Sequence, residues 1–414
     1  MEIKNIKAIR IIDSRGVPTI KTFVETKNSI ESASVPSGTS SGDFEALELR
    51  DNSKSFFKMD VLKAIKNVNT IINSALKGDF VLDQKEIDNK LIKLDGTSNK
   101  SKLGANAILS VSLACAKVAA KELDIPLYLY LSRLNNTKKL KFPTPFLNII
   151  NGGLHSGGNF LAFQEFQIIP EKFKSFEDKI KASCEVYNCL KEIISKKLGS
   201  SSTNVGYEGG FVPILKKQDE FMALDLIQLA IDKLKYSKEI SLGLDCAANS
   251  FYNKDSKKYF FDSNSFSSDD LINYYSDLLK TYNIKAIEDP FSETDKSSWK
   301  KFTSKFSSKI KIIGDDLLVT NPKFINQAIK NKFCNSLLLK VNQIGTLTES
   351  INSFNIAKKA NWDVEISHRS GETEDTFIAD LAYGLSSEYI KFGAPSRSER
   401  TSKYNRLIEI ESFL

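Results

Sequence analysis

The 414-residue sequence is poor in cysteine and histidine, and both scarcities narrow what the protein can be. Its five cysteines are odd in number and form no CxxC pair, a usage typical of buried thiols in a reducing compartment. We therefore expect a cytoplasmic protein. The only two histidines, His155 and His368, both lie in glycine- or serine-rich segments. Because a rare residue placed twice in such loops is better explained by function than by packing, both are candidate site residues.

A long hydrophobic run is also missing. Residues 1–7 contain two lysines and no apolar core of a signal peptide. The most apolar long stretch, residues 103–120, is interrupted by Asn106, Lys117 and two serines. A stretch of this kind indicates a buried helix, so we expect no membrane span.

Signatures of nucleic-acid and nucleotide binding are absent as well. The net charge is +7, but basic residues are interleaved with acids and form no basic stripe, so we expect no nucleic-acid partner. Neither a GxGxxG motif nor a P-loop occurs, which disfavours nicotinamide and nucleotide chemistry.

Arginine is scarce, with 8 arginines against 50 lysines. Where lysine is the default cation, we expect each remaining arginine to need its planar, bidentate side chain. Five of them fall within the motifs described below: Arg15, Arg50, Arg369, Arg397 and Arg400.

The chain is longer than one typical domain and fits a barrel of roughly 250 residues preceded by a smaller domain. Its first part predicts three strands with alternating apolar residues, followed by three helices, which is an α+β arrangement. The strands are expected at 3–12, 19–26 and 30–35, and the helices at 60–78, 85–94 and 105–121. We predict an N-terminal domain at 1–134, a linker at 135–142 and a barrel domain at 143–414.

After the linker, short apolar strands alternate with helix-length segments. This pattern predicts an α/β fold with a (β/α)8-type barrel, because eight strands suffice for closure. The candidate strands are residues 146–150, 165–169, 242–244, 286–287, 311–313, 336–339, 364–366 and 389–390.

Charged residues stand at the ends of several predicted barrel strands. Asp245, Glu288 and Asp315 end three consecutive strands, and Lys340 and Lys391 end two later ones. Gaps of about one strand-plus-helix unit bring such residues together at the C-terminal mouth of a barrel. Three acids without cysteine or histidine beside them indicate a hard cation such as Mg²⁺. A lysine aimed at the same mouth suggests a base.

With these residues in place, the sequence resembles the enolase family from end to end. The most specific motifs are LKVNQIGT at 339–346 and SHRSGETEDT at 367–376. Shorter matching motifs are DSRG at 13–16, PSGTSSG at 36–42, EALELRD at 45–51, NGGLH at 151–155, EGG at 208–210, IEDPF at 287–291, KFGAP at 391–395 and RSER at 397–400. The resemblance implies a lyase that reversibly dehydrates 2-phospho-D-glycerate to phosphoenolpyruvate and water in glycolysis and gluconeogenesis. It also implies a homodimer or a higher homo-oligomer.

The resemblance assigns metal ligands. Asp245, Glu288 and Asp315 would hold one Mg²⁺, and a second Mg²⁺ would arrive with the substrate and be held partly by Ser40. Preorganised cations stabilise the extra negative charge that forms on the substrate carboxylate when the neighbouring carbon loses its proton. Enolase-superfamily sites are a known example of a lysine or histidine base paired with one or two Mg²⁺ ions.

The resemblance also assigns the reacting groups, with Lys340 as base and Glu208 as acid. We expect the two cations and Lys391 to lower the pKa of Lys340, because they disfavour its charged form. We expect clustered carboxylates near Glu208 to keep one of them protonated. The substrate-binding residues implied are His155, Gln164, Glu165, His368, Arg369, Ser370 and Lys391.

Three departures from the family pattern concern Val17, Tyr207 and the loop at 155–165. The family commonly has asparagine at the position of Val17 and aspartate at the position of Tyr207. The loop at 155–165 is one residue longer than usual. None of these removes a metal, base or phosphate group. Two alternatives remain: another acid-dehydrating or racemising member of the superfamily, and an enolase fold kept as a binding module without catalysis.

Overall fold

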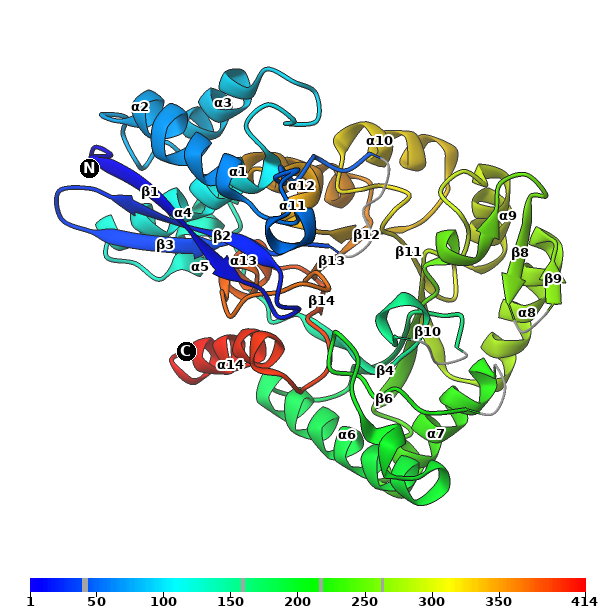
Figure 1. Ribbon diagram of the computed structural model, residues 1–414. Helices are drawn as coiled ribbons and strands as arrows, with labels where there is room; N and C mark the ends of the chain where they lie inside the picture. The colour runs from blue at the N-terminus through cyan, green and yellow to red at the C-terminus, as the bar shows by residue number, and fades with distance from the viewer. Residues whose placement is uncertain (39–43, 158–160, 216–218, 262–263) are drawn as a thin grey trace.

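The computed structural model describes residues 1–38, 44–157, 161–215, 219–261 and 264–414. The predicted metal ligand Ser40, like residues 159–160 of the longer loop, lies outside the described residues. An N-terminal sheet with its helices lies beside a closed barrel of eight strands (Figure 1).

The N-terminal sheet is an antiparallel meander of β1 (Asn5–Ile12), β2 (Pro18–Glu25) and β3 (Ile30–Ser34). The turn between β1 and β2 is tied by Asp13, whose carboxylate accepts the backbone N–H groups of Arg15 and Val17 at 2.8 and 3.0 Å. Aspartate favours such turns because its short side chain reaches the backbone two residues on.

Helices cover this sheet. They are α1 (Leu62–Asn67), α2 (Asn73–Leu76), α3 (Gln84–Asp95), α4 (Ala105–Glu122) and α5 (Leu127–Asn135). A five-residue π-helical segment at Val68–Ile72 separates α1 from α2, where the sequence predicted one helix. As predicted, α4 is buried around most of its circumference, and it packs against β2 and β3 (Figure 1).

The predicted eight-stranded barrel is confirmed. Its strands are β4 (Thr144–Asn151), β5 (Glu165–Pro170), β6 (Ile240–Asp245), β10 (Ile284–Glu288), β11 (Lys311–Gly314), β12 (Ser336–Leu339), β13 (Asp363–Ser367) and β14 (Tyr389–Lys391). The helices that follow β5 and the later strands are α6 (Phe176–Leu198), α7 (Glu220–Lys233), α8 (Ser268–Thr281), α9 (Lys296–Phe306), α10 (Pro322–Asn331), α11 (Val341–Ile344), α12 (Leu347–Lys359), α13 (Phe377–Leu385) and α14 (Ser398–Ser412). A small three-stranded sheet, β7 (Tyr252–Asn253), β8 (Lys258–Phe261) and β9 (Asn264–Phe266), was not predicted.

The strict βα alternation predicted for the barrel is wrong at its second strand. β5 pairs antiparallel with both β4 and β6, and the other neighbouring barrel strands pair in parallel. Among its described residues, the connection from β4 to β5 contains one short 3-10 turn, Gly153–His155, and no crossover helix. A parallel neighbour would need a helical crossover of a dozen or more residues. As a result the first residue of β5, Glu165, lies opposite the last residue of β6, Asp245.

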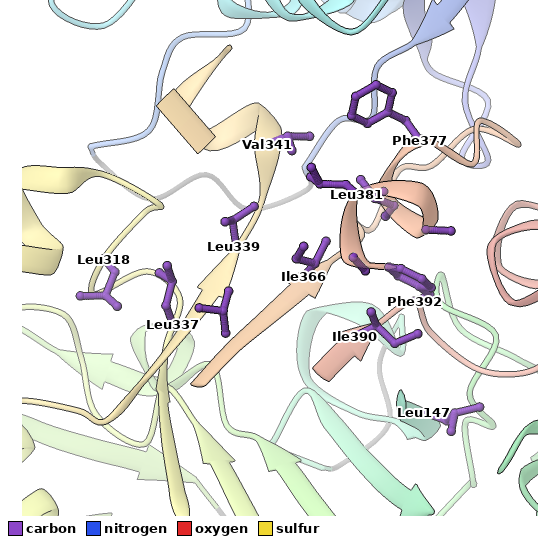
Figure 2. Close-up of a cluster of buried hydrophobic side chains, with 14 of the residues drawn as sticks. Leu147, Leu318, Leu337, Leu339, Val341, Ile366, Phe377, Leu381, Ile390 and Phe392 are labelled. Atoms are coloured by element: carbon purple, nitrogen blue, oxygen red, sulfur yellow. The ribbon is translucent and has the colours of Figure 1, made fainter. Parts of the chain in front are cut away.

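Two apolar cores follow from the alternation of side chains along the barrel strands. Outward-facing residues pack against the surrounding helices and loops, as Figure 2 shows for Ile366 beside Leu381 of α13. Inward-facing residues form a separate cluster, here named the barrel plug: Phe146, Ile169, Ala286, Ile313 and Leu338. The plug fills the barrel interior, so the polar cavity can open only at its mouth.

Within the described part of the chain, every helix is too short or too polar to traverse a lipid bilayer.

Candidate active site

A polar cavity opens at the barrel mouth, and most of the predicted site residues line it. The predicted residues in its lining are His155, Gln164, Glu165, Glu208, Asp245, Asp315, Lys340, His368, Arg369, Ser370 and Lys391. Glu288 lies at the floor, where it contacts Lys391. Thus every predicted site residue in the described part of the chain belongs to one cluster.

Lys391 is the centre of the cavity floor. Its Nζ lies 2.7 Å from Glu288 and 3.1 Å from both Asp245 and Glu165. Gln164 donates a further hydrogen bond to Asp245, at 3.2 Å. Burial opposes the charge of Lys391, but the surrounding acids outweigh it and raise the pKa of the lysine well above its ordinary value. The ammonium therefore stays charged and holds the ends of three strands together.

Lys340 forms an ion pair of its own. Its Nζ lies 2.5 Å from Asp315 Oδ2, and the other oxygen of Asp315 accepts a hydrogen bond from Gln343 at 2.8 Å. Burial lowers the pKa of Lys340, but Asp315 and Glu288 raise it, and the net pKa lies above the ordinary value. The lowering expected from the sequence rested on cations near Lys340. In the structure, where Asp315 is the nearest charge, the pKa of Lys340 is raised and not lowered.

Glu208 lies between the two histidines. Its Oε1 is 3.3 Å from His155 Nδ1 and 3.4 Å from His368 Nε2, and its Oε2 accepts a hydrogen bond from Asn148 at 2.9 Å. Burial raises the pKa of Glu208, but the two histidines bring it well below the ordinary value. Burial and the neighbouring Glu208 raise the pKa of Glu165 instead. Of these two acids, Glu165 is therefore the one whose surroundings favour the protonated form.

The tautomer of His368 follows from Arg400. The guanidinium of Arg400 can only donate, so His368 Nδ1, 2.7 Å away, must accept. The proton is then on Nε2, which faces Glu208. Burial and the positive charge of Arg400 lower the pKa of His368 to about 3, so the ring acts on Glu208 as a neutral dipole at neutral pH. Arg400 also fixes the Arg369–Ser370 backbone by donating to both carbonyls, at 2.6 and 2.7 Å.

Arg369 uses its fork as the arginine scarcity predicted, but on a carboxylate. Its two terminal nitrogens donate to Glu45 at 2.8 and 3.2 Å, and one also donates to Asn342 at 3.1 Å. Burial lowers the pKa of Arg369, and Glu45 raises it above the ordinary value. A phosphate dianion, which can present two oxygens to the same two nitrogens, could take the place of the carboxylate.

Three acids of the cavity were not among the predicted site residues: Glu45, Asp289 and Asp316. Asp289 accepts the backbone N–H groups of Asp315 and Asp316 at 2.9 and 2.8 Å, which fixes the end of β11. Burial and Asp315 raise the pKa of Asp316 to about 7. Glu45 and Asp289 lie inside motifs that carried the resemblance, and Asp316 directly follows the predicted ligand Asp315. The sequence therefore contained a signal for each of them.

The donor atoms of the cavity suit a hard cation. Two groups of described residues bring possible ligand atoms within 4.8 Å of one another: His155, Glu165 and Glu208, and Asp289, Asp315 and Asp316. The predicted trio Asp245, Glu288 and Asp315 is not one of these groups, because Lys391 holds the first two and Lys340 holds the third. Glu288 Oε1 is buried and accepts no hydrogen bond from a described residue. Carboxylate oxygens of this kind are ligands that Mg²⁺ prefers.

Comparison with known proteins agrees with this geometry. The family described as "Enolase, N-terminal domain" matches residues 3–131, and "Enolase, C-terminal TIM barrel domain" matches residues 139–414. The chain belongs to the enolase family. It is 49% identical over its whole length to an enolase of Solanum lycopersicum, covering 95% of that protein. It is also 49% identical to enolase B of Dictyostelium discoideum, with 95% covered, and 48% identical to enolase 1 of Entamoeba histolytica, with 97% covered.

Proposed function

We propose that this enolase-family hydro-lyase reversibly dehydrates 2-phospho-D-glycerate to phosphoenolpyruvate and water in glycolysis and gluconeogenesis. One observation carries the proposal. A partly buried lysine outside the central ion cluster, Lys340, and a buried acid, Glu208, line the same cavity, together with Lys391 and Arg369. This set supplies a base, an acid and two cationic anchors for an anionic substrate.

Asp245, Glu288 and Asp315 would hold Mg²⁺, and Ser40 would contribute to a second ion that binds with the substrate. Bound there, Mg²⁺ supplies the positive charge that stabilises the extra negative charge on the substrate carboxylate. Engagement of Asp315 would remove the contact that raises the pKa of Lys340.

Lys340 then takes the proton from the carbon beside the carboxylate. The neutral amine needs a lowered pKa, and loss of the Asp315 contact together with nearby positive charge gives that direction. Lys391 binds the substrate carboxylate, because its ammonium stays charged among the acids of the floor.

Glu208 delivers a proton to the leaving hydroxide. Because its histidine neighbours lower its pKa while the pKa of Glu165 is raised, we assign Glu165 as the group that passes the proton to Glu208. The neutral ring of His368 and the amide of Asn148 hold the Glu208 carboxyl in place. Gln164 orients Asp245.

Arg369 and Ser370 bind the phosphate. The phosphate competes with Glu45 for the guanidinium, and a dianion favours the exchange. His155 lies in the connection between β4 and β5, and we assign it to closure over the bound substrate.

We further propose a cytoplasmic location, a homodimer or higher homo-oligomer, and a division into domains at 1–134 and 143–414 joined by a linker at 135–142. The two family matches, 3–131 and 139–414, support this division.

The test is turnover by the purified protein. With 2-phospho-D-glycerate and Mg²⁺ we expect the ultraviolet absorbance of the enol phosphate to rise. A chelator should stop the reaction and excess Mg²⁺ should restore it. D-Glycerate, which lacks the phosphate, is the matched control and should not react. Absence of phosphoenolpyruvate in saturating Mg²⁺ would refute the proposed function.

A further inference from the structure

Two buried amides lie between the apolar barrel plug and the charged mouth. Gln167 lies between Glu165 and Ile169 on one face of β5, and Ile169 belongs to the plug. Its register partner on β4 is Asn148, which lies two residues after the plug residue Phe146. We name Asn148 and Gln167 the amide layer.

Each residue of the amide layer donates to one carboxylate of the acid pair. Gln167 Nε2 lies 2.8 Å from Glu165 Oε2, and the amide of Asn148 lies 2.9 Å from Glu208 Oε2. All four residues are buried. Both hydrogen bonds are therefore shielded from water, where a bond to a carboxylate is stronger than at the surface.

The neighbouring strand leaves room for the side chain of Gln167. Its register partner on β6 is Gly243. A Cβ atom at position 243 would lie 2.6 Å from Gln167 Oε1, closer than two such atoms can approach. The amide would have to move to avoid that contact, and its Nε2 would then leave Glu165.

The carboxyl group of Glu165 needs an anchor of this kind. The terminal torsion of a glutamate is broad, so the carboxyl plane turns easily. Lys391 contacts Glu165 Oε1 at 3.1 Å, but an ammonium is a compact charge that leaves the plane free to turn. Lys391 is also assigned to the substrate carboxylate. Gln167 holds the other oxygen from below, so its hydrogen bond is a contact that substrate binding leaves in place.

Stability alone is a poor explanation for an amide in this layer. Burial strips water from the side chain of Gln167, and its hydrogen bonds only offset that cost. A methionine would fill a similar volume next to the plug without a polar group to satisfy. The amide is better explained by its contact with Glu165.

We propose that Gln167 is a positioning residue that acts through Glu165, holding its carboxyl group in the orientation from which a proton passes to Glu208. The inference rests on the proposed function. As Glu208 protonates the leaving hydroxide to water, the proton of Glu165 replaces the one given up, and Glu165 becomes a carboxylate. Such a transfer needs hydrogen-bond geometry between the two groups. Asn148 holds the accepting carboxyl, and Gln167 holds the donating one.

Loss of the amide should slow only one half of the reaction. In Gln167→Met we expect kcat for phosphoenolpyruvate formation to fall about tenfold, the size expected for one hydrogen bond to a charged group. KM should stay near the parental value, because the amide donates to Glu165 and not to a residue that binds the phosphate. Removal of the proton beside the carboxylate depends on Lys340 and should continue at the parental rate.

The test measures both halves in the same variant. Ultraviolet absorbance follows phosphoenolpyruvate, and proton NMR in deuterium oxide follows exchange of the hydrogen on the carbon beside the carboxylate. Gly243→Ala keeps Gln167 but displaces its amide, and it should likewise lower turnover while exchange stays parental. Parental turnover in both variants, or an equal fall of turnover and exchange in Gln167→Met, would overturn the inference.

A double-mutant cycle tests whether Gln167 acts through Glu165. Glu165→Gln should lower kcat by itself, since it removes the proton source. Adding Gln167→Met should lower kcat no further, because the carboxyl group to be positioned is already gone. Additive losses would show that Gln167 acts by another route and would refute its assigned role.

Gln84→Met is the matched control. Gln84 is also a buried amide that donates to a carboxylate, Asp88, at 3.1 Å, but it lies on α3 of the N-terminal part. Its turnover and exchange should equal those of the parent, whatever happens to its melting temperature. A loss of turnover as large as that of Gln167→Met would assign the effect to stability and overturn the inference.

The same measurements separate this inference from the proposed function. A parent that forms no phosphoenolpyruvate would refute both. A parent that reacts, together with a Gln167→Met variant of parental kcat, would refute the role of Gln167 and leave the proposed function standing.

Discussion

The barrel interior has two regions that differ in almost every respect, the apolar plug and the charged mouth. Both are built from inward-facing residues of the same strands, as in β11, where Ile313 belongs to the plug and the following inward position, Asp315, lines the cavity. Two residues along a strand, roughly 6.6 Å, separate them. The plug needs only volume and apolar surface, whereas the mouth needs balanced charge. Stability and chemistry are therefore assigned to different layers of one barrel.

The largest effect should come from the mouth. Lys340→Ala removes the proposed base, and we expect kcat to fall by about 10²–10⁴. The melting temperature should change little, because the variant removes a buried charge from a cavity wall. Steady-state kinetics and thermal unfolding measure the two effects.

The control for that variant is Lys280→Ala, which breaks an exposed pair with Asp277 on the surface of α8. It should match the parent in both kinetics and stability. A Lys340→Ala enzyme that works at near-parental rate would show that the base has been misassigned.

A substitution in the plug should lower stability and leave kcat unchanged. Ile169 lies two layers below Glu165 on β5, and Ile169→Ala should lower the free energy of unfolding by about 2–5 kcal/mol. The kcat of the folded protein should remain that of the parent. Denaturant unfolding followed by circular dichroism measures the loss, and Ile169→Val should lose only about 0.5–1.5 kcal/mol. A large drop in kcat at unchanged stability would mean that the two layers are not separable.

A smaller effect is expected at the edge of the mouth. Arg369→Lys keeps the charge but loses the planar fork, so we expect KM for the phosphorylated substrate to rise about tenfold, or roughly 1.4 kcal/mol, with a smaller change in kcat. Initial rates over a range of substrate concentrations check this. Arg10→Lys, which changes an ion pair with Asp60 in the N-terminal part, is the matched control. Equal KM values for both variants would argue against a phosphate contact.

Much of the fold was predictable because alternation and spacing are local properties. The eight barrel strands, the N-terminal meander and the buried helix α4 were all placed correctly. The direction of β5 was missed, since an apolar run looks the same in both directions. Only the connection at 152–164, glycine-rich and close to the shortest length that a crossover allows, carried that information. The break between α1 and α2 was missed as well, because a π-helical segment keeps nearly the same apolar face.

The candidate site, like the fold, could be predicted from the sequence only in part. The acids and lysines at strand ends were predicted because the C-terminal ends of barrel strands meet at the mouth. The structure brings these residues into one cavity. Glu45 was missed as a site residue because its partner Arg369 is distant in sequence and joined to it only by the fold. The roles assigned to the site residues remain predictions.

The reversed strand β5 has a consequence for how this protein can change over time. A connection between parallel strands must travel down the outside of the barrel and return, so altering it disturbs helices and register. The connection from β4 to β5 instead begins and ends at the rim. Insertions and deletions there can reshape the entrance while the scaffold stays as it is, which makes this segment a place where natural variation can accumulate with little structural penalty.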